Sequence, residues 1–380
     1  MINKTSVITE RKIVVVNAAA AKTGGALTIL REFVSAISKP DSVEINYVLI
    51  TSIDLYQHVP SHICVINIGG QNYIERVLWD YYGFKRYLKS KGIIPNLILS
   101  FQNTGVVFPK MCPQVVYFHN PFCLVPKQWN IFKKNERTLF FYTFIYPLFI
   151  RALINQNTSF IVQANWIKDA FSKRFKFDKE KISVVIPSVQ KLPDIVNADS
   201  KLDKIRFFFP ATSYLYKNHE LLFDMLVRFQ ELKPEMYEST ELLLTLSEKD
   251  IRALGLFEKY SILRDKIILK GYVDIIELTK CYMQSDLILF PSTIETFGLP
   301  LVEAASLNKK IICSDLPFAY ETLEGYSNVK FISPTNSDKW ATTLVEFLDI
   351  RSEDNSAFIE SRVQHNSWKD IIEIIKNTIN

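Results

Sequence analysis

The stretch "DLILFPSTIETFGLPLVEAAS" (residues 286–306) runs from an apolar segment through a short loop into a helix-like segment. Its apolar run has the continuous character of a strand covered on both faces of a parallel sheet. Gly298 permits unusual backbone angles, and Pro300 suits the first turn of a helix, where its missing N–H costs nothing. Two carboxylates, Glu295 and Glu303, flank this turn. The stretch is therefore either a loop followed by an ordinary surface helix, or a ligand site at the end of a buried strand.

Similar apolar runs recur along the whole chain, separated by helix-like segments such as 26–38 and 73–91. They lie at 12–17, 45–50, 63–68, 96–101, 114–119, 159–164 and 182–187, and again at 205–210, 242–247, 266–271, 286–291, 310–315 and 329–334. This alternation predicts an α/β fold with parallel sheets. The length of 380 residues favours two domains.

We expect two Rossmann-like, doubly wound domains, over residues 1–190 and 204–362. The polar segment "KLPDIVNADSKLD" (191–203) interrupts the alternation and predicts a linker. The apolar spacing of "SWKDIIEIIKNTIN" (367–380) predicts an amphipathic helix, and we expect residues 363–380 to pack back toward the first domain. Because ligands of open α/β sheets bind beyond the carboxyl ends of the strands, the two domains should face a central cleft that holds the site.

Charge is distributed unevenly along the chain. Residues 1–190 carry 23 basic and 11 acidic side chains, whereas residues 191–380 carry 22 and 29. Clusters at 84–91, 133–137 and 173–181 supply much of the positive charge. This asymmetry predicts that the first half faces an anionic partner such as a membrane surface, with solvated helix faces as the alternative. No recognised nucleic-acid motif occurs, so no nucleic-acid partner is expected.

The apolar stretch "TLFFYTFIYPLF" (138–149) is too short to span a bilayer and contains Pro147. We expect it to pack as a helix in the core, with a membrane interface as the alternative. The N-terminus lacks the apolar core of a signal peptide. The scattered cysteines, such as Cys281 and Cys313, suggest buried free thiols, and with the histidines they form no metal-binding set. These features predict a cytoplasmic protein without a metal.

Two loops beyond predicted strands carry candidate ligand-binding residues. In "NAAAAKTGGALTIL" (17–30), Gly24 and Gly25 precede a helix and would let the backbone approach an anion, although a simple tight turn explains them equally. The loop lacks the G-x-G-x-x-G fingerprint, which argues against a nicotinamide enzyme. In "FFFPATSYLYKNHELL" (207–222), Lys217 would offset the charge of a diphosphate or would simply be solvated.

The third loop is the opening stretch. The backbone N–H groups around Phe297–Leu299 and the helix dipole favour a phosphate. Carboxylates repel an anion, so Glu295 and Glu303 need another purpose. Ionised carboxylates accept hydrogen bonds strongly from sugar and ribose hydroxyls. A nucleotide sugar offers hydroxyls on both sides of a diphosphate and fits the loop, the helix and both carboxylates.

At this point the residues resemble a known family. The segment "LILFPSTIETFGLPLVEAASLNKKIICSD" (287–315) is similar to the C-terminal signature of retaining glycosyltransferase family 4, with its E-x7-E motif at Glu295 and Glu303. Further similar segments are "NAAAAKTGGA", "YFHNP" (117–121), "FIVQANWIKDAF" (160–171), "VVIPS" (184–188), "FPATSYLYKNHELL", "ILKGYV" (268–273) and "SW" (367–368). The resemblance covers most of the chain and implies a GT-B fold, in which two Rossmann-like domains face a central cleft.

The resemblance also implies roles for individual residues. Three would be catalytic: Glu295 would contact the transferred sugar, Lys217 would meet the diphosphate, and His119 would lie near the reacting centre. Glu303 would bind the ribose hydroxyls. The other expected donor-binding residues are Gly24, Gly25, Tyr272, Val273, Thr296, Phe297, Gly298 and Leu299. One position departs from the family, because Thr212 stands where an arginine is common, five residues before Lys217.

The implied reaction moves a sugar from a nucleoside diphosphate donor to a hydroxyl group with retention of configuration and without a metal or other cofactor. A UDP-sugar is the preferred donor and a GDP-sugar the alternative. The expected acceptor is a glycan or a lipid-linked oligosaccharide in the synthesis of a bacterial surface polysaccharide such as O-antigen or capsule. The expected location is the cytoplasm, peripheral to the inner face of the plasma membrane. A nucleotide-sugar epimerase and a catalytically inactive nucleotide-binding or scaffold protein are the alternatives.

Overall fold

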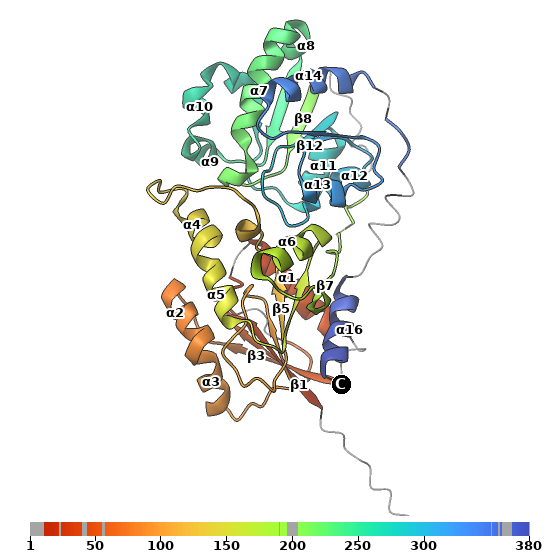
Figure 1. Cartoon of the computed structure of the whole chain (residues 1–380). Helices are drawn as coiled ribbons and strands as arrows, with labels where there is room; N and C mark the ends of the chain where they lie inside the picture. The colour runs from red at the N-terminus through yellow and green to blue at the C-terminus, as the bar shows by residue number, and fades with distance from the viewer. Residues whose placement is uncertain are drawn as a thin grey trace, which may run out of the picture. The chain divides into compact units, whose positions relative to one another are not determined.

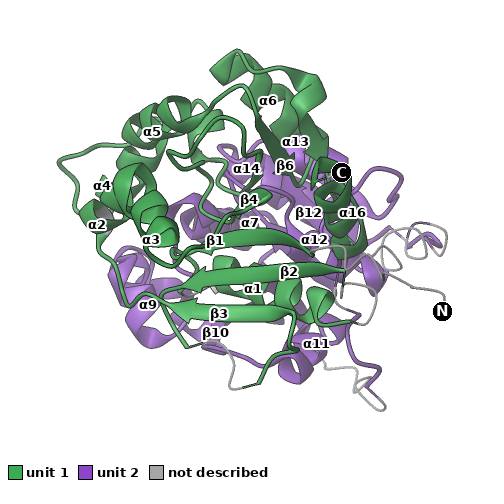
Figure 2. Cartoon of the chain, turned by 90° about the horizontal axis from the view of Figure 1, so that it is seen from below, with its two compact units in different colours: residues 1–186, 366–380 green, residues 187–365 purple. Residues whose placement is uncertain are grey.

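The computed structural model describes residues 11–22, 24–39, 44–54, 58–189, 191–195, 204–350, 352–355, 358 and 367–379. The chain divides into two compact units (Figures 1 and 2). Unit 1 comprises residues 1–186 and 366–380, and unit 2 comprises residues 187–365. Of the predicted linker 191–203, residues 191–195 form neither helix nor strand, and residues 196–203 lie outside the described part of the chain.

Unit 1 is built on a sheet of seven parallel strands in the order β3-β2-β1-β4-β5-β6-β7. The strands are β1 (Lys12–Ala18), β2 (Ile45–Thr51), β3 (Ile63–Asn67), β4 (Leu97–Ser100), β5 (Gln114–Phe118), β6 (Thr158–Val162) and β7 (Ile182–Val184). All seven strands predicted in the first half are present, with ends displaced by a few residues. Their continuous apolar sequences reflect burial on both faces, as expected for a parallel sheet.

The helices of unit 1 include two π-helical segments, η2 and η4, each placed between two α-helices. The helical elements are α1 (Gly24–Ile37), α2 (Tyr73–Leu78), η2 (Trp79–Gly83), α3 (Phe84–Ser90), η3 (Phe122–Leu124), α4 (Arg137–Phe140), η4 (Phe141–Ile145), α5 (Tyr146–Leu153), α6 (Asn165–Phe175), η5 (Lys179–Lys181) and α16 (Ser367–Ile379). The predicted helix 73–91 is therefore α2, η2 and α3 in succession. A π-turn adds one residue to the helical repeat and turns the following side chains to a different face.

The core of unit 1 lies on both faces of its sheet. Val14 and Val16 pack into one buried cluster and Val15 into the other, because successive side chains of a strand point to opposite faces. The predicted C-terminal helix is present as α16 and belongs to the first of these clusters. The ring of Trp368 lies 5.8 Å from that of Phe33 (centroid to centroid). Helix α16 and strand β1 thus share one core although they lie far apart in the sequence.

The apolar stretch 138–149 forms the helical succession α4, η4 and α5. It buries Leu139, Tyr146 and Ile150, so the interpretation as a packed helical segment is confirmed for that face. On the other face, Phe144 and Leu148 are exposed, Leu148 to 65% of its full area. Within the described ranges, no helix combines the length and the apolar character needed to cross a membrane.

Unit 2 contains a second all-parallel sheet, with six strands in the order β10-β9-β8-β11-β12-β13. The strands are β8 (Ile205–Phe209), β9 (Thr240–Leu244), β10 (Ile267–Leu269), β11 (Leu287–Phe290), β12 (Lys310–Ser314) and β13 (Val329–Ile332). The helical elements are η6 (Leu215–Lys217), α7 (His219–Leu232), α8 (Pro234–Glu238), α9 (Glu248–Ala253), α10 (Leu256–Lys259), η7 (Ser261–Lys266), α11 (Ile275–Met283), α12 (Leu299–Ser306), α13 (Pro317–Thr322) and α14 (Ser337–Leu348). All six strands predicted in the second half are present.

Each sheet reverses its strand order once, and these reversals locate the ligand sites that a doubly wound fold offers. In unit 1 the reversal lies between β1 and β4, whose last paired residues are Asn17 and Ser100. In unit 2 it lies between β8 and β11, which end at Phe209 and Phe290. The loops beyond these four strand ends contain most of the residues expected at the site.

The cysteine prediction is confirmed in part. Cys281 and Cys313 are buried and free, as expected from their apolar surroundings. Cys64 is exposed, so the interpretation as a buried thiol is wrong there. It lies on β3, which forms the edge of the seven-stranded sheet and is less covered than the central strands.

Candidate functional site

In unit 2, the loops that follow β8 and β11 are joined by direct hydrogen bonds. The backbone N–H of Thr293 donates to the carbonyl of Tyr216 over 2.7 Å. The side-chain amide of Asn218 donates to the carbonyl of Pro291 over 3.3 Å and to that of Pro334 over 2.9 Å. These bonds fix the loop that carries Lys217 against the loop that carries Glu295.

Helix α12 begins at the turn predicted from the sequence. Gly298 precedes it with a φ of +85°, a left-handed conformation that glycine adopts without strain. A Cβ atom at this position would lie 3.2 Å from Cδ1 of Leu301, so space as well as conformation favours glycine. The amides of Phe297, Gly298 and Leu299 lie at the start of the helix, where no preceding helical carbonyl accepts from them. With the helix dipole, they make this end suitable for an anion.

Lys217 and Glu295 form an ion pair at this edge of the sheet. Lys217 Nζ lies 2.5 Å from Glu295 Oε1, and the two side chains are only 13% and 14% exposed. The lysine ammonium also lies 5.7 Å from the centre of the Phe290 ring. Two residues that are 78 positions apart in the sequence are thus brought together, as their proposed roles around one ligand require.

Glu303 lies inside α12, and a tyrosine of the neighbouring helix α11 fixes its carboxylate. The hydroxyl of Tyr282, a fully buried residue of α11, donates to Glu303 Oε2 over 2.8 Å. Burial raises the pKa of the Glu303 carboxyl, and the hydrogen bond from Tyr282 partly offsets that rise. A carboxylate fixed in this way by one hydrogen bond keeps acceptor positions for ligand hydroxyls.

The remaining expected residues of unit 2 lie around this centre or beside it. Phe297 is buried, and its carbonyl accepts a hydrogen bond from Thr322. Thr296 is half-buried, and Leu299 is 39% exposed. Tyr272 is 99% exposed, and Val273 beside it is half-buried, on the loop after β10.

In unit 1, His119 lies just beyond the end of β5 and is held by Asn103. The His119 backbone N–H donates to Asn103 Oδ1 over 2.6 Å, and the Asn103 amide lies 3.4 Å from His119 Nε2. Burial lowers the pKa of His119 to about 4, so the ring is neutral at neutral pH. A neutral imidazole can accept a hydrogen bond or donate one without carrying charge.

The glycines of unit 1 occupy the start of α1. Helix α1 begins at Gly24, and five residues separate it from the end of β1 at Ala18. A Cβ atom built on Gly25 would meet no protein atom within 4 Å, so packing within the chain does not require glycine there. The space beside Gly25 leaves room for a ligand to approach the backbone.

Several residues of these centres were not foreseen from the sequence. Tyr282 and Thr322 act through contacts that follow from tertiary packing, and nothing in their local sequence marks them. Asn103 and Asn218 have positive φ values of 62° and 58°, which asparagine tolerates better than most residues. Such an asparagine in the loop that follows a strand is a weak signal that sequence reading could have used. Thr212, the departure noted above, is exposed.

The sequence of this chain is similar to those of known glycosyltransferases. Residues 194–364 match the family model described as "Glycosyl transferases group 1", so this part of the chain is a group 1 glycosyltransferase domain. The O-antigen chain mannosyltransferase RfbU of Salmonella typhimurium is 26% identical over 209 residues, which are 53% of this chain and 55% of that protein. The chain thus spans about half the length of this curated relative.

Solved structures show the fold. WaaG, a glycosyltransferase involved in lipopolysaccharide biosynthesis, is similar with a TM-score of 0.68 and 14% identity, over 96% of this chain and 99% of that one. Anabaena HepE, solved in complex with UDP, has a TM-score of 0.63 and 17% identity, over 97% and 99%. These similarities and the two parallel sheets give the chain the GT-B fold of two Rossmann-like domains. The predicted fold class is therefore confirmed, and the central cleft stays a prediction.

Proposed function

We propose, from the group 1 glycosyltransferase domain of residues 194–364, that this chain transfers a sugar from a nucleoside diphosphate donor to a hydroxyl group with retention of configuration. The observation that carries the proposal is the ion pair of Lys217 and Glu295, set beside the N-terminus of α12. A cation, a set of amides and the Glu295 carboxylate then lie within one pair of neighbouring loops, and Glu303 follows in the second turn of α12. This combination suits a ligand with a charged diphosphate between two groups of hydroxyls.

Each part of the donor would contact a different group of these residues. The diphosphate would lie at the amides of Phe297, Gly298 and Leu299 and would attract Lys217. Glu295 would then exchange the lysine for a hydroxyl of the sugar, and Glu303 would accept hydrogen bonds from the ribose. Tyr272 and Val273 would border the base. Gly24 and Gly25 would approach the diphosphate from unit 1, and His119 would lie near the sugar.

The proposed reaction is a front-face substitution. The bond between the anomeric carbon and the β-phosphate oxygen breaks, and the acceptor oxygen bonds to the same face of that carbon. The acceptor proton passes to the departing diphosphate, which leaves with the bonding electron pair. Negative charge grows on the diphosphate, so Lys217 and the helix amides stabilise the transition state more than the ground state. Neither an enzyme nucleophile nor a metal ion takes part.

The donor, the acceptor and the location also follow as proposals. HepE was solved with UDP, which supports a UDP-sugar, and RfbU is a mannosyltransferase, which makes a mannose donor such as a GDP-sugar the alternative. The printed roles of RfbU and WaaG support an acceptor of lipopolysaccharide or O-antigen type. We place the protein in the cytoplasm, where its basic first half would contact the anionic inner face of the plasma membrane.

A donor screen tests the proposal. UDP-, GDP- and ADP-sugars would be compared by thermal shift and then by nucleotide release with candidate acceptors, in the presence of EDTA. We expect one class of donor to raise the melting temperature and to be consumed only with an acceptor, giving a product of retained anomeric configuration by NMR. Conversion of the donor without any acceptor would support the epimerase alternative, which RfbU and WaaG do not favour. Binding of a donor without any turnover would support an inactive member.

A further inference from the structure

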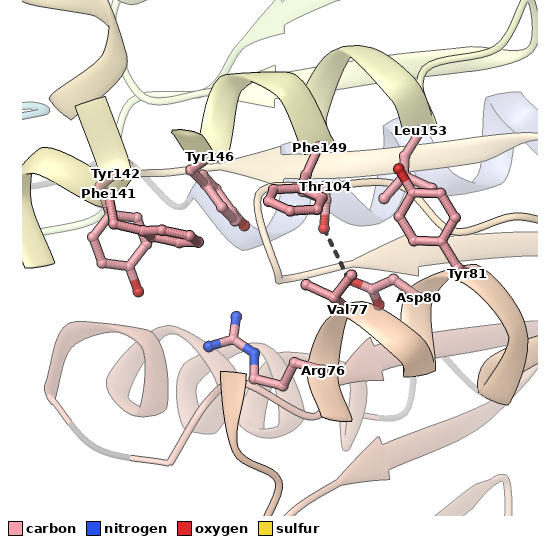
Figure 3. Close-up of a pocket in the computed structure, with 10 residues that line it drawn as sticks. All are labelled: Arg76, Val77, Asp80, Tyr81, Thr104, Phe141, Tyr142, Tyr146, Phe149 and Leu153. Atoms are coloured by element: carbon pink, nitrogen blue, oxygen red, sulfur yellow. Dashed lines mark hydrogen bonds between the residues drawn. The ribbon is translucent and has the colours of Figure 1, made fainter. Parts of the chain in front are cut away.

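The loop that follows β4 is anchored on both sides of Asn103. Before it, the side-chain amide of Gln102 donates to Asn17 Oδ1 over 2.5 Å. After it, the hydroxyl of Thr104 donates to Asp80 Oδ2 over 3.2 Å, a contact that Figure 3 marks with a dashed line. The Asn17 amide donates to Asp80 Oδ1, also over 3.2 Å, and so joins the two anchors. Because Gln102 and Thr104 are only 1% and 2% exposed, this network holds the loop from the interior of the unit.

Asn103 lies between these anchors and directs its side chain at His119. Its φ of +62° lies in the left-handed region, which asparagine tolerates better than most residues. Both ends of its amide group contact the histidine. Oδ1 lies 2.6 Å from the His119 backbone nitrogen, and Nδ2 lies 3.4 Å from His119 Nε2. One buried side chain thus contacts both the backbone and the ring of the residue that follows β5.

The contact with the backbone determines which end of the Asn103 amide is the oxygen. A backbone N–H can only donate a hydrogen bond, so the atom 2.6 Å from the His119 nitrogen must be the carbonyl oxygen. The other end is then the NH2 group, which also can only donate. The opposite orientation would place two donors against each other at the backbone and leave both without an acceptor.

The NH2 group in turn determines where His119 carries its proton. Burial lowers the pKa of His119 to about 4, against a smaller opposite effect of the Tyr117 backbone, so the ring is neutral at neutral pH. A neutral imidazole has one nitrogen that donates and one that accepts. A proton on Nε2 would point at the hydrogens of the Asn103 amide, whereas a lone pair on Nε2 accepts from them. The proton of the neutral ring therefore belongs on Nδ1.

The two ring nitrogens differ in what they offer to a ligand. Nδ1 is buried, whereas His119 as a whole is only half-buried, so Nε2 is the ring nitrogen left to contact a ligand. Its contact with the Asn103 amide, at 3.4 Å, is longer than an ordinary hydrogen bond, so the lone pair can still accept from a closer donor. A hydroxyl group is such a donor, and an ionised phosphate is not, because it has no proton to donate.

We propose that Asn103 is a positioning residue that holds His119 in its Nδ1–H form, and that Nε2 then accepts a hydrogen bond from a sugar hydroxyl of the ligand. The inference rests on the proposed function, in which His119 lies near the sugar. It adds the direction of that hydrogen bond and the residue that sets it. The buried network around Asp80 acts indirectly, because it holds the loop that carries Asn103.

The position of the ring proton is measured by NMR on the full chain, labelled with nitrogen-15 histidine and free of ligand. The shifts of the two ring nitrogens and their couplings to the ring hydrogens identify the nitrogen that carries the proton. Spectra are recorded at pH 8, and the His119 signals are assigned by their loss in His119→Gln. We expect the proton on Nδ1. A proton mainly on Nε2 in the parent protein would overturn the proposal without any variant of Asn103.

Two substitutions of Asn103 test its role. Asn103→Asp replaces the donating NH2 group by a second acceptor and keeps a residue that tolerates the left-handed backbone, so it should move the ring proton to Nε2. Asn103→Gly removes the side chain without backbone strain and should populate both forms. Asn96→Asp is the matched control, because Asn96 Oδ1 likewise accepts from a backbone N–H, that of Ile13, and it should keep the proton on Nδ1. A proton that stays on Nδ1 in folded Asn103→Asp protein would overturn the role of Asn103.

Donor probes test the contact with the sugar. UDP-glucose is compared with UDP, and GDP-mannose with GDP, by isothermal titration calorimetry on the parent and on Asn103→Asp. For a nucleotide sugar that binds the parent, we expect Asn103→Asp to weaken its affinity about fivefold more than that of the free nucleotide, because Nε2 then has no lone pair and its proton is held by the new carboxylate. The free nucleotide is the control for the added negative charge, which acts on its diphosphate as well.

The outcomes separate this inference from the proposed function. An equal loss of affinity for the nucleotide sugar and for the free nucleotide would overturn the contact with the sugar. If neither nucleotide sugars nor nucleotides bind, the proposed function and the contact with the sugar both fail, whereas the NMR result still decides the role of Asn103. If donors bind and are turned over while the parent His119 carries its proton on Nε2, the proposed function stands and this inference fails.

Discussion

The polar centres of the two units differ in whether their ionisable side chains have a partner of opposite charge. In unit 2, Lys217 and Glu295 neutralise each other, and Glu303 is supported by a tyrosine hydroxyl. In unit 1, Asp80 and His119 are buried without an opposite charge in contact, and their pKa values move to about 7 and about 4, each mainly through burial. In unit 2 the lysine and the glutamate already bind each other, so a ligand that binds either of them must replace that contact. In unit 1, His119 is neutral at neutral pH and Asp80 is only partly ionised, so the centre carries little charge of its own.

The largest expected effect concerns the ion pair of unit 2. Glu295→Ala should lower the rate of sugar transfer about 10³-fold, because the sugar loses its carboxylate contact in the transition state. The initial rate of nucleotide release with an acceptor measures this, once a donor is identified. Glu346→Ala, at an exposed position of α14, serves as control and should keep the parent rate. A Glu295→Ala rate within tenfold of the parent would contradict the role assigned to this residue.

The partner of Glu295 gives the next test. Lys217→Met should lower the turnover number roughly 10²-fold, because charge on the leaving diphosphate is less stabilised. It should also lower the melting temperature, since it leaves Glu295 partly buried without its counter-charge. Combining Lys217→Met with Glu295→Gln should recover stability but not activity. If the double variant is no more stable than Lys217→Met, the pair contributes nothing to folding.

Asp80 tests the other side of the comparison through pH. Its pKa rises from 3.8 to about 7 on folding, so the folded protein binds the proton more tightly than the unfolded chain. Stability from this group is therefore greatest at low pH and is lost as the pH rises from about 4 to 7. Asp80→Asn removes this dependence and should gain about 2 kcal/mol relative to the parent between pH 5 and pH 8. Urea denaturation at both values measures the gain.

The histidines do not obscure that measurement. Burial lowers the pKa of His119 to about 4 and that of His219 to about 3, so both destabilise the folded protein as the pH falls below about 6.5. Parent and variant share this effect, and the difference between them isolates Asp80. Asp265→Asn, at an exposed position, should show no such gain. A pH-independent difference for Asp80→Asn would mean that the carboxyl is ionised throughout.

The smallest expected effect concerns the hydrogen bond from Tyr282 to Glu303. Tyr282→Phe removes a hydrogen bond that opposes the rise of the Glu303 pKa. Glu303 should then be protonated more readily, and donor affinity should fall roughly fivefold at pH 6 and less at pH 8, which corresponds to about 1 kcal/mol. Titration of the nucleotide at both pH values distinguishes this from a simple loss of packing, which would weaken binding equally at both.

The same comparison explains what the sequence could predict. The centre of unit 2 is formed largely by one continuous stretch, in which strand, glycine, proline and both glutamates occur in order. Glu295 and Glu303 can therefore be located from the order of residue types alone. The polar centre of unit 1 combines Asn17, Asp80, Gln102 and Thr104, which hydrogen bonds join across separate strands and helices. No local pattern brings such residues together, so this centre required the tertiary fold.

Secondary structure shows a similar division. The strands of both sheets follow from apolar runs, because burial on both faces leaves a strong compositional signal. The π-helical segments η2 and η4 were not expected, since apolar and aromatic residues such as those of 141–145 fit an α-helix equally well. Whether one residue is inserted into the helical repeat depends on what packs against it, as the close approach of Trp79 to Gly83 illustrates.

Helix α16 has a consequence for synthesis of the protein. It supplies Trp368, Ile371 and Ile375 to the core that also contains β1 and α1, so unit 1 is assembled from two segments that are separated by unit 2 in the sequence. Helix α16 must be synthesised and leave the ribosome before that core can close, whereas unit 2 is contiguous in sequence and can fold earlier. Until α16 is synthesised, Phe33 and its apolar neighbours on α1 lack the side chains that cover them in the folded protein. A chain truncated before residue 367 would therefore leave that apolar surface uncovered, even though every residue proposed to hold the donor is present.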